Sequence, residues 1–265
     1  MVAFLAMDLD GTLVPHTLKI SERNLKAVQA AREAGILVTV ATGRMSPSAS
    51  PYIKELGIDL PIITYNGAMI ADMKSGKVLR EEPLSKEVVK PLLELCRERG
   101  WYIQAYKDDR LLIYEENEKS RMYSRIAGVP AEVIGDELWQ MDQTTKLLSI
   151  AANDEEQAEM AATFREYFGD KGNVAESLGS YVEITSLEAE KGKAVAFLCN
   201  HYGIPMSQVM AIGDGGNDVG MIQAAGIGIA MGGAKDKIKV LADGVTADAE
   251  SDGVALAIEK YIFKL

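Results

Sequence analysis

The sequence predicts an α/β protein whose parallel-sheet domain is interrupted by an inserted α+β domain. Strand and helix patterns alternate over residues 1–82 and again over residues 184–265, as in the βαβ units that build parallel sheets. The order of elements changes over residues 83–183, which we assign to the insert. Two apolar runs about 200 residues apart both end in acidic loops, so neighbouring strands would bring their carboxylates together.

The first elements follow from apolar runs and turn residues. Residues 2–7 are a short apolar run typical of a buried strand, and residues 21–34 form a helical pattern with Ser21 as its cap. Residues 36–41 predict the next strand, followed by a helix that ends near Gly57. After residues 61–64, a hairpin is expected from the segments 68–72 and 77–82, which are separated by a Lys-Ser-Gly turn.

The insert mixes helices and strands without regular alternation. Its expected elements are a helix at 85–99, strands at 101–106 and 110–114, a helix at 116–127, a strand at 146–151, a helix at 154–168, and strands near Val174 and Tyr181. It holds 12 basic and 20 acidic residues, which is −8 of the net charge of −11. Such acidity usually means a solvated face. We expect most of its aromatic residues to pack in its own core rather than to stack on sugars.

The segment Met7-Asp8-Leu9-Asp10-Gly11-Thr12 places two carboxylates directly after the first strand. Carboxylates bind Mg²⁺ and can act as nucleophiles or proton carriers. Taken alone, the segment is equally typical of an Asp-rich turn. The run Val209–Gly213 ends in the same way, in a loop that carries Asp214, Asn217 and Asp218. Four converging carboxylates would repel one another strongly without a cation, and Mg²⁺ is the natural one.

Two further segments carry groups suited to an anion. Thr42-Gly43-Arg44 follows the strand expected at 36–41, so a hydroxyl and backbone amides stand at another strand end. Thr42 could hold a phosphoryl oxygen or cap the helix that begins near Ser46. Lys191 lies at the start of an apolar helical pattern, where a cation opposes the helix dipole. That unfavourable position suggests an anion nearby, although a lone lysine is usually a solvated surface residue.

With these segments identified, the chain resembles the haloacid dehalogenase superfamily, and within it the Cof-like phosphatases with a type IIB cap. The four family motifs are similar in order and spacing to residues 8–13, 42–44, 191–192 and 213–218, and a cap-sized insert separates the second from the third. Tyr65-Asn66-Gly67-Ala68 and Ile229-Ala230-Met231-Gly232 are similar to secondary signatures of the subfamily. One departure is Gly233, where relatives often carry Asn.

The resemblance implies a Rossmann-like core, a cap over residues 83–183, and a role for each motif residue. Asp8 would be the nucleophile and Asp10 the general acid and base. The implied Mg²⁺ ligands are Asp8, Asp10, Asp214 and Asp218, with Asp218 acting in support. The implied phosphate contacts come from Leu9, Thr42, Gly43, Lys191 and Asn217. Arg44 would brace its loop.

Composition limits the remaining possibilities. We expect no nucleic-acid partner, because the net charge is −11 and the phosphates of a nucleic acid require a basic protein face. We see neither an apolar run of membrane-spanning length nor a secretory signal, and two cysteines predict no disulfide framework. We therefore expect a cytoplasmic enzyme without a membrane partner, as a monomer or weak homodimer.

The leading functional hypothesis is a Mg²⁺-dependent phosphatase of a small phosphorylated metabolite, with sugar phosphates and phosphoglycolate-like acids as candidates. A phosphomutase or other phosphotransferase would share the aspartyl-phosphate intermediate. A phosphometabolite-binding regulatory protein is the alternative from another class. The intact pair Asp8 and Asp10 argues against it, because a binding protein needs no nucleophile beside an acid.

Overall fold

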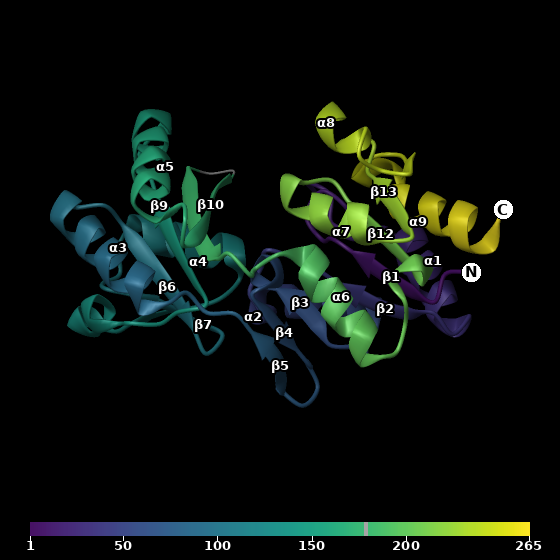
Figure 1. Ribbon diagram of the computed structural model, residues 1–265, viewed down its shortest axis with the longest axis horizontal. Helices are drawn as coiled ribbons and strands as arrows, with labels where there is room; N and C mark the ends of the chain where they lie inside the picture. Colours follow the sequence, from purple (N-terminus) through teal and green to yellow (C-terminus); the bar gives the residue numbers. More distant parts are fainter. Residues whose placement is uncertain (178–179) are drawn as a thin grey trace. The chain divides into compact units, whose positions relative to one another are not determined.

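The computed structural model describes residues 1–177 and 180–265, which divide into two units. Residues Met1–Arg80 and Glu190–Leu265 form the first, which we call the core unit, and residues Glu81–Ala189 form the second, the cap unit (Figure 1). The predicted α/β core with an inserted α+β unit is confirmed. No helix within the described residues is both long and apolar enough to cross a membrane.

The core unit is built on a parallel sheet with the strand order β14-β13-β12-β1-β2. Its strands are β1 (Phe4–Met7), β2 (Leu37–Val40), β12 (Val209–Gly213), β13 (Ile227–Ala230) and β14 (Gly244–Val245). β1 lies between β2 and β12, and Met7 is paired with Val40 on one side and Ile212 on the other. The first and fourth motif segments therefore begin at neighbouring strand ends.

Helices cover both faces of this sheet, which explains why its strands are continuous apolar runs. They are α1 (Glu22–Glu33), α2 (Ser46–Leu56), α6 (Lys191–His201), α7 (Val219–Ala224), α8 (Asp236–Lys239) and α9 (Gly253–Ile258). Phe4 and Ala6 of β1 share a core cluster with residues of α6 and α7, whereas Leu5 and Met7 share another with residues of α1 and α9. Short helical turns are η1 (Tyr65–Gly67), η3 (Met206–Gln208), η4 (Gly216–Asp218), η5 (Ala249–Ser251) and the π-turn η6 (Glu259–Phe263).

Local signals in the sequence set several of these boundaries. The Ser21 side chain accepts a hydrogen bond from the Asn24 amide at 3.1 Å, so the predicted cap of α1 is confirmed. α2 ends at Gly57 in the left-handed conformation, as expected. The predicted hairpin is β4 (Met69–Ala71) with β5 (Val78–Glu81), and β3 (Ile62–Thr64) pairs with β4. A parallel bridge between Ala41 and Ile63 ties β3 to the end of β2.

The cap unit holds a mixed sheet with the order β10-β11-β9-β6-β7-β8. Its strands are β6 (Ile103–Lys107), β7 (Arg110–Ile113), β8 (Ala131–Val133), β9 (Lys146–Ile150), β10 (Gly172–Ser177) and β11 (Tyr181–Ser186), and its helices are α3 (Lys86–Arg99), α4 (Glu118–Ala127), α5 (Asp154–Phe168) and the 3₁₀ turn η2 (Gly135–Gln140). The sequence analysis missed β8, whose three residues are too few to show a period. An apolar cluster that includes Cys96, Trp101 and Phe164 fills the space between α3, α5 and the sheet.

The predicted domain boundaries need a correction. The boundary at 183/184 cuts β11, because Ile184 and Thr185 still pair with Leu147 and Lys146 of β9. The unit boundary lies instead after Ala189. At the other junction the unit boundary lies after Arg80. Glu81 belongs to the cap unit, where its carboxylate accepts from the Thr145 hydroxyl at 2.8 Å.

Candidate active site

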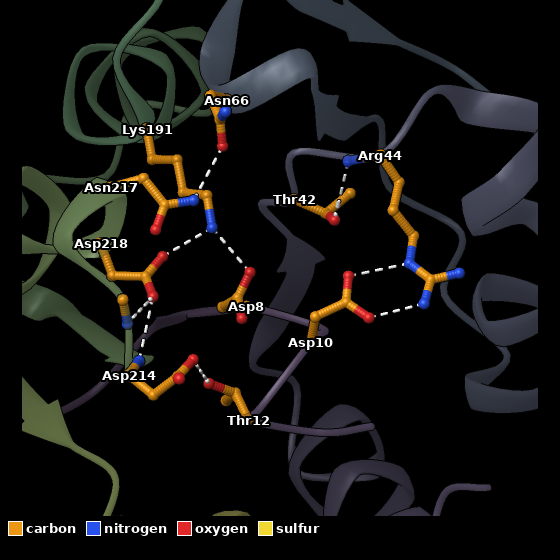
Figure 2. Close-up of polar contacts among 11 residues, drawn as sticks. Asp8, Asp10, Thr12, Thr42, Arg44, Asn66, Lys191, Asp214, Asn217 and Asp218 are labelled. Carbon is orange, nitrogen blue, oxygen red and sulfur yellow. Dashed lines mark hydrogen bonds and ion pairs between the residues drawn. The ribbon is translucent and has the colours of Figure 1, made fainter. Parts of the chain in front are cut away.

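The ends of β1 and β12 bring the two acidic loops together. Asp8 follows β1 directly, and its backbone amide donates to the carbonyl of Ile212 in β12 at 3.0 Å. Asp214 follows β12 directly. Figure 2 shows the side chains of Asp8, Asp214, Asp218 and Lys191 turned toward one another at this sheet edge. Of the four carboxylates expected to converge, those of Asp8, Asp214 and Asp218 do so, whereas Asp10 does not, because Arg44 pairs with it outside the cluster.

Lys191 is a buried cation between two carboxylates. Its side chain is 0% exposed, and its Nζ lies 2.6 Å from Asp8 Oδ1 and 2.6 Å from Asp218 Oδ1. Burial alone would lower the pKa of Lys191, but the charges of Asp218 and Asp8 more than offset it, so the pKa is raised. The ammonium group is therefore charged at neutral pH. Lys191 is buried, so it is not the solvated surface residue that a lone lysine in a sequence usually is.

The environment of Asp8 is unfavourable for a negative charge. Burial raises its pKa well above the usual value, and the charges of Asp218 and Asp214 add to this, while Lys191 acts in the opposite direction. The pKa of Asp214 is raised too, by burial and then by Asp218. An additional cation at this point would stabilise the charged forms of both carboxylates.

Asp218 is fully committed to contacts within the chain. Its Oδ1 accepts from Lys191, and its Oδ2 accepts from the backbone amides of Asp214 at 2.9 Å and Gly215 at 2.8 Å. Its side chain is 1% exposed. These contacts fix the loop after β12 and hold Lys191 against Asp8. The geometry therefore suits a supporting carboxylate better than a direct metal ligand.

The donor set of this cluster fits Mg²⁺. Carboxylate oxygens of Asp8, Asp214 and Asp218 all lie within 4.8 Å of one another. Mg²⁺ binds oxygen at about 2.0–2.1 Å, so oxygens on opposite sides of the ion are about 4.2 Å apart. The cluster is close to that spacing, and its ligand atoms are hard oxygens. Asp8 and Asp214 could hold the ion, with Asp218 behind them.

Asp10 is placed apart from the buried cluster. Its side chain is 51% exposed and forms a two-pronged ion pair with Arg44, whose Nε lies 2.8 Å from Oδ2 and whose Nη2 lies 2.5 Å from Oδ1 (Figure 2). Arg44 also lies 4.9 Å from the centre of the Tyr52 ring. Arg44 thus orients Asp10 as well as its own loop, a contact that the sequence analysis did not anticipate.

The residues expected to contact phosphate surround the same place. The Thr42 hydroxyl accepts from the Arg44 amide at 3.1 Å, so it does not cap α2, whose N-cap is Met45. Leu9 is buried in the core below the loop. The Asn217 side chain donates to Asn66 Oδ1 at 2.8 Å.

Asn66 was missed as a site residue by the sequence analysis. It lies in the turn η1 with a φ of 58°, and a Cβ at Gly43 would lie 3.0 Å from its Oδ1. It therefore joins the loop after β2 to Asn217 of the loop after β12. The Tyr65-Asn66-Gly67-Ala68 segment noted in the sequence was the signal that could have found it.

The absence of a side chain at Gly11 leaves room for the Asp214 carboxylate. A Cβ at Gly11 would lie 2.5 Å from Asp214 Oδ2, and the φ of 82° is itself strained for other residues. Asp214 is also held by Thr12, whose hydroxyl lies 3.2 Å from its Oδ1. Replacing Gly11 should therefore displace a carboxylate of the cluster.

We expect Gly11→Ala to weaken Mg²⁺ binding by about tenfold or more, since one ligand is displaced. Mg²⁺ titration followed by thermal melting measures this. Gly35→Ala is a matched control, because Gly35 has a φ of 83° but nothing within 4 Å of its Cβ position. Gly35→Ala shares only the backbone strain, so it should lose less stability than Gly11→Ala and keep an unchanged Mg²⁺ affinity. Equal Mg²⁺ affinities of the Gly11→Ala and Gly35→Ala proteins would contradict the contact between position 11 and Asp214.

Gly233 places no special demand on the backbone. A Cβ there would lie 3.9 Å from the Asp248 Cβ, which is ordinary van der Waals contact. The backbone here therefore has room for the Cβ of a larger residue such as the asparagine noted in relatives.

One family model matches most of the chain. The model of haloacid dehalogenase-like hydrolases matches residues 5–258. The chain belongs to this family. The Cof-like resemblance inferred from the four motifs is confirmed, and the protein is a haloacid dehalogenase-like hydrolase.

Individual relatives are similar over the whole of this hydrolase. It is 29% identical to the chloroplastic endoribonuclease YBEY of Arabidopsis thaliana, covering 98% of this chain but only 47% of that protein, about half its length. It is 27% identical to the 5-amino-6-(5-phospho-D-ribitylamino)uracil phosphatase YitU of Bacillus subtilis, covering 97% and 96%. The solved structure of the subclass IIB sugar phosphatase BT4131 is similar with a TM-score of 0.82 and 26% identity, covering 98% and 99%.

Proposed function

We propose that this hydrolase is a Mg²⁺-dependent phosphatase that acts on a small phosphorylated metabolite through an aspartyl-phosphate on Asp8. The observation that carries the proposal is the buried Asp8 carboxylate, held at a strand end by Lys191 and facing Asp214. A carboxylate so placed can attack phosphorus, because Lys191, together with Mg²⁺ when it is bound, would offset the repulsion of the phosphoryl oxygens. The family membership and the phosphatase named among its relatives support the same reaction.

Asp8 Oδ attacks phosphorus in line, and the bond between phosphorus and the leaving oxygen breaks as the Asp8 bond forms. For the first step the Asp10 carboxylate takes up a proton from solvent, its ion pair with Arg44 opens, and the carboxyl group then gives that proton to the leaving alkoxide. In the second step Asp10 takes a proton from water, which attacks phosphorus and releases phosphate from Asp8. The ion pair with Arg44 keeps the Asp10 carboxyl oriented between the two steps.

Bound Mg²⁺ would supply positive charge to the phosphoryl oxygens and to Asp8. The residues proposed to hold it are Asp8 and Asp214 through their carboxylates and Asp10 through its backbone carbonyl, with Asp218 in support. Leu9, Thr42, Gly43, Lys191 and Asn217 would contact the phosphoryl group. Positioning and electrostatics of this kind dominate phosphoryl transfer. The cap unit is proposed to select the substrate.

The leading substrates are sugar phosphates and phosphoglycolate-like acids. The B. subtilis relative is named for a phosphorylated ribityl compound, and BT4131 is named a sugar phosphatase. Both names favour sugar phosphates over phosphoglycolate-like acids. The proposal is tested by incubating the purified protein and Mg²⁺ with phosphorylated metabolites that carry a radioactive phosphoryl group. We expect label in free phosphate, loss of activity with a chelator, and recovery with Mg²⁺.

The same experiment separates the alternatives. Label found mainly in an isomeric sugar phosphate would favour a phosphomutase. Metabolite binding without release or transfer of label would favour a regulatory protein and overturn the proposal.

A further inference from the structure

The turn η1 of the core unit has a backbone conformation that residues other than glycine rarely adopt. Its three residues all have positive φ angles, 51° at Tyr65, 58° at Asn66 and 104° at Gly67. Asparagine and glycine tolerate such angles, but a bulky residue such as tyrosine adopts them only at a cost in conformational free energy. Tyr65 is 0% exposed, so the surrounding core holds it in place. Strain of this kind persists only where neighbouring contacts impose it, and it is concentrated at functional sites.

Two backbone hydrogen bonds join this turn to the loop after β2. The Tyr65 amide donates to the Arg44 carbonyl at 3.0 Å, and the Asn66 amide donates to the Thr42 carbonyl at 3.0 Å. Gly43 lies between these two carbonyls, and a Cβ there would lie 3.0 Å from Asn66 Oδ1. The loop that carries the Thr42 hydroxyl and the Gly43 amide is therefore held against the turn over three consecutive residues.

Gly67 brings the same turn against the start of α6. A Cβ at Gly67 would lie 2.5 Å from the backbone oxygen of Glu190 and 2.8 Å from its backbone nitrogen, so only glycine allows this close approach. Glu190 is the N-cap of α6 and directly precedes Lys191. The turn therefore also limits the position from which the Lys191 side chain extends toward Asp8.

The Asn66 side chain reaches the third segment of the site, the loop after β12. Its Oδ1 accepts from Asn217 Nδ2 at 2.8 Å (Figure 2). Among the residues that the structure describes, Asn66 is the one hydrogen-bond partner of the Asn217 side chain. Asn217 is exposed, so without this bond its side chain would be free to populate several rotamers. The amide nitrogen of Asn217 carries two N–H groups, and Asn66 uses one of them, which fixes the direction of the other.

We infer that Asn66 is a positioning residue for phosphoryl transfer, which holds the Asn217 amide in one orientation before the substrate binds. Asn217, Thr42 and Lys191 contact the phosphoryl group in the proposed function, on which this inference rests. Donors that are fixed in advance stabilise the transition state without reorganisation during the reaction. The strained turn contacts all three segments that carry these donors, so it sets their positions relative to one another.

A double-mutant cycle tests whether Asn66 acts through Asn217. Asn66→Gly removes the side chain and keeps the turn, because glycine adopts a φ of 58° without strain. In the full-length protein we expect kcat/KM for a sugar phosphate to fall about five- to tenfold. In an Asn217→Ala background the same substitution should lower kcat/KM less than about twofold, because the partner is already absent. A similar loss in both backgrounds, or no loss in the wild-type background, would overturn the inference.

Asn66→Asp shows whether the accepting oxygen is what matters. Aspartate tolerates the left-handed conformation and keeps an oxygen that accepts from Asn217. Asn217→Ala should therefore lower kcat/KM as much in the Asn66→Asp protein as in wild type, and about threefold less in the Asn66→Gly protein. This comparison does not depend on how the added charge at position 66 changes overall activity. Equal effects of Asn217→Ala in the two Asn66 variants would contradict the role of the Asn66 oxygen.

Asp252→Gly is the matched control for the backbone change. Asp252 has a φ of 59° and a ψ of 34°, close to the 58° and 26° of Asn66, but it is the N-cap of α9. Thermal melts check that both glycine variants are folded. The Asp252→Gly protein should keep kcat/KM within about twofold of wild type. A loss at position 252 as large as that at position 66 would show that the contact with Asn217 is not responsible.

Calorimetry with inorganic phosphate in the presence of Mg²⁺ repeats the cycle without turnover. We expect Asn66→Gly to weaken phosphate binding by about threefold or more in the wild-type background, and less in the Asn217→Ala background. A protein that shows this coupling in phosphate binding but releases no phosphate from any substrate would contradict the proposed function alone. Turnover in which the substitutions at positions 66 and 217 act independently would contradict this inference alone.

Discussion

Asp8→Asn is expected to lower phosphate release by about 10³-fold or more, roughly 4 kcal/mol of barrier. An amide neither attacks phosphorus effectively nor donates charge to Mg²⁺. The fold should persist, because the asparagine oxygen can still accept from Lys191 Nζ, which lies 2.6 Å from Asp8 Oδ1. Loss of one charge from a crowded group of carboxylates also removes repulsion from Asp214 and Asp218. Phosphate release and circular dichroism on the purified variant check both expectations.

Thermal melting with and without Mg²⁺ extends this test. Wild type should gain more stability from Mg²⁺ than the variant, because a ligand that binds the native state stabilises it in proportion to its affinity. A folded Asp8→Asn protein that keeps more than a few per cent of wild-type turnover would remove Asp8 from the role of nucleophile.

Lys191→Met should produce the largest loss of stability among the site variants. Lys191 is 0% exposed and lies between Asp8 and Asp218, so its removal leaves two buried carboxylates without their cation. Breaking a buried pair from one side costs about 3–5 kcal/mol. We expect a lower melting temperature, a loss of turnover of about 10²-fold or more, and partial recovery of stability at high Mg²⁺ concentration.

Lys193→Met provides the comparison on the same helix. Lys193 is exposed, two residues along α6, so the same substitution there should change melting temperature and turnover little. Similar effects of the two substitutions would show that α6 itself, rather than the ammonium group beside Asp8, is responsible. Absence of any Mg²⁺-dependent recovery in Lys191→Met would contradict the idea that the ion and the lysine share the same negative charge.

The aromatic residues of the cap unit show what a sequence pattern leaves open. The sequence analysis expected its aromatic residues to pack in a core, and Trp101 and Phe164 do so, with rings 5.9 Å apart. The Tyr123 ring packs too, 6.5 Å from that of Tyr106 and 5.4 Å from that of Tyr181, but the Tyr123 hydroxyl also accepts a hydrogen bond from the Tyr106 hydroxyl at 2.6 Å. No period in the sequence distinguishes purely apolar packing from packing that carries a hydrogen bond, since aromatic residues of both kinds occupy regular positions on helices and strands.

The sequence by itself determined the fold class and the strands that end at the site. Apolar runs ending in Asp8 and Asp214 give buried parallel strands, because a strand covered on both faces has no polar position. The cap of α1 by Ser21 and the end of α2 at Gly57 are equally local, since each depends on a single residue's hydrogen bond or φ. Such features need only neighbouring residues, and so a linear pattern is enough to predict them.

Tertiary structure alone decided how the side chains at those strand ends divide their contacts. Asp10 turns away to Arg44, Asp218 is saturated by Lys191 and two backbone amides, and Asn217 meets Asn66 across 151 positions of sequence. These outcomes depend on which rotamers remain after the loops have packed, and on competition between several charged partners within a few ångströms. The sequence lists the competing groups but not their distances, and Coulomb and hydrogen-bond energies depend on distance.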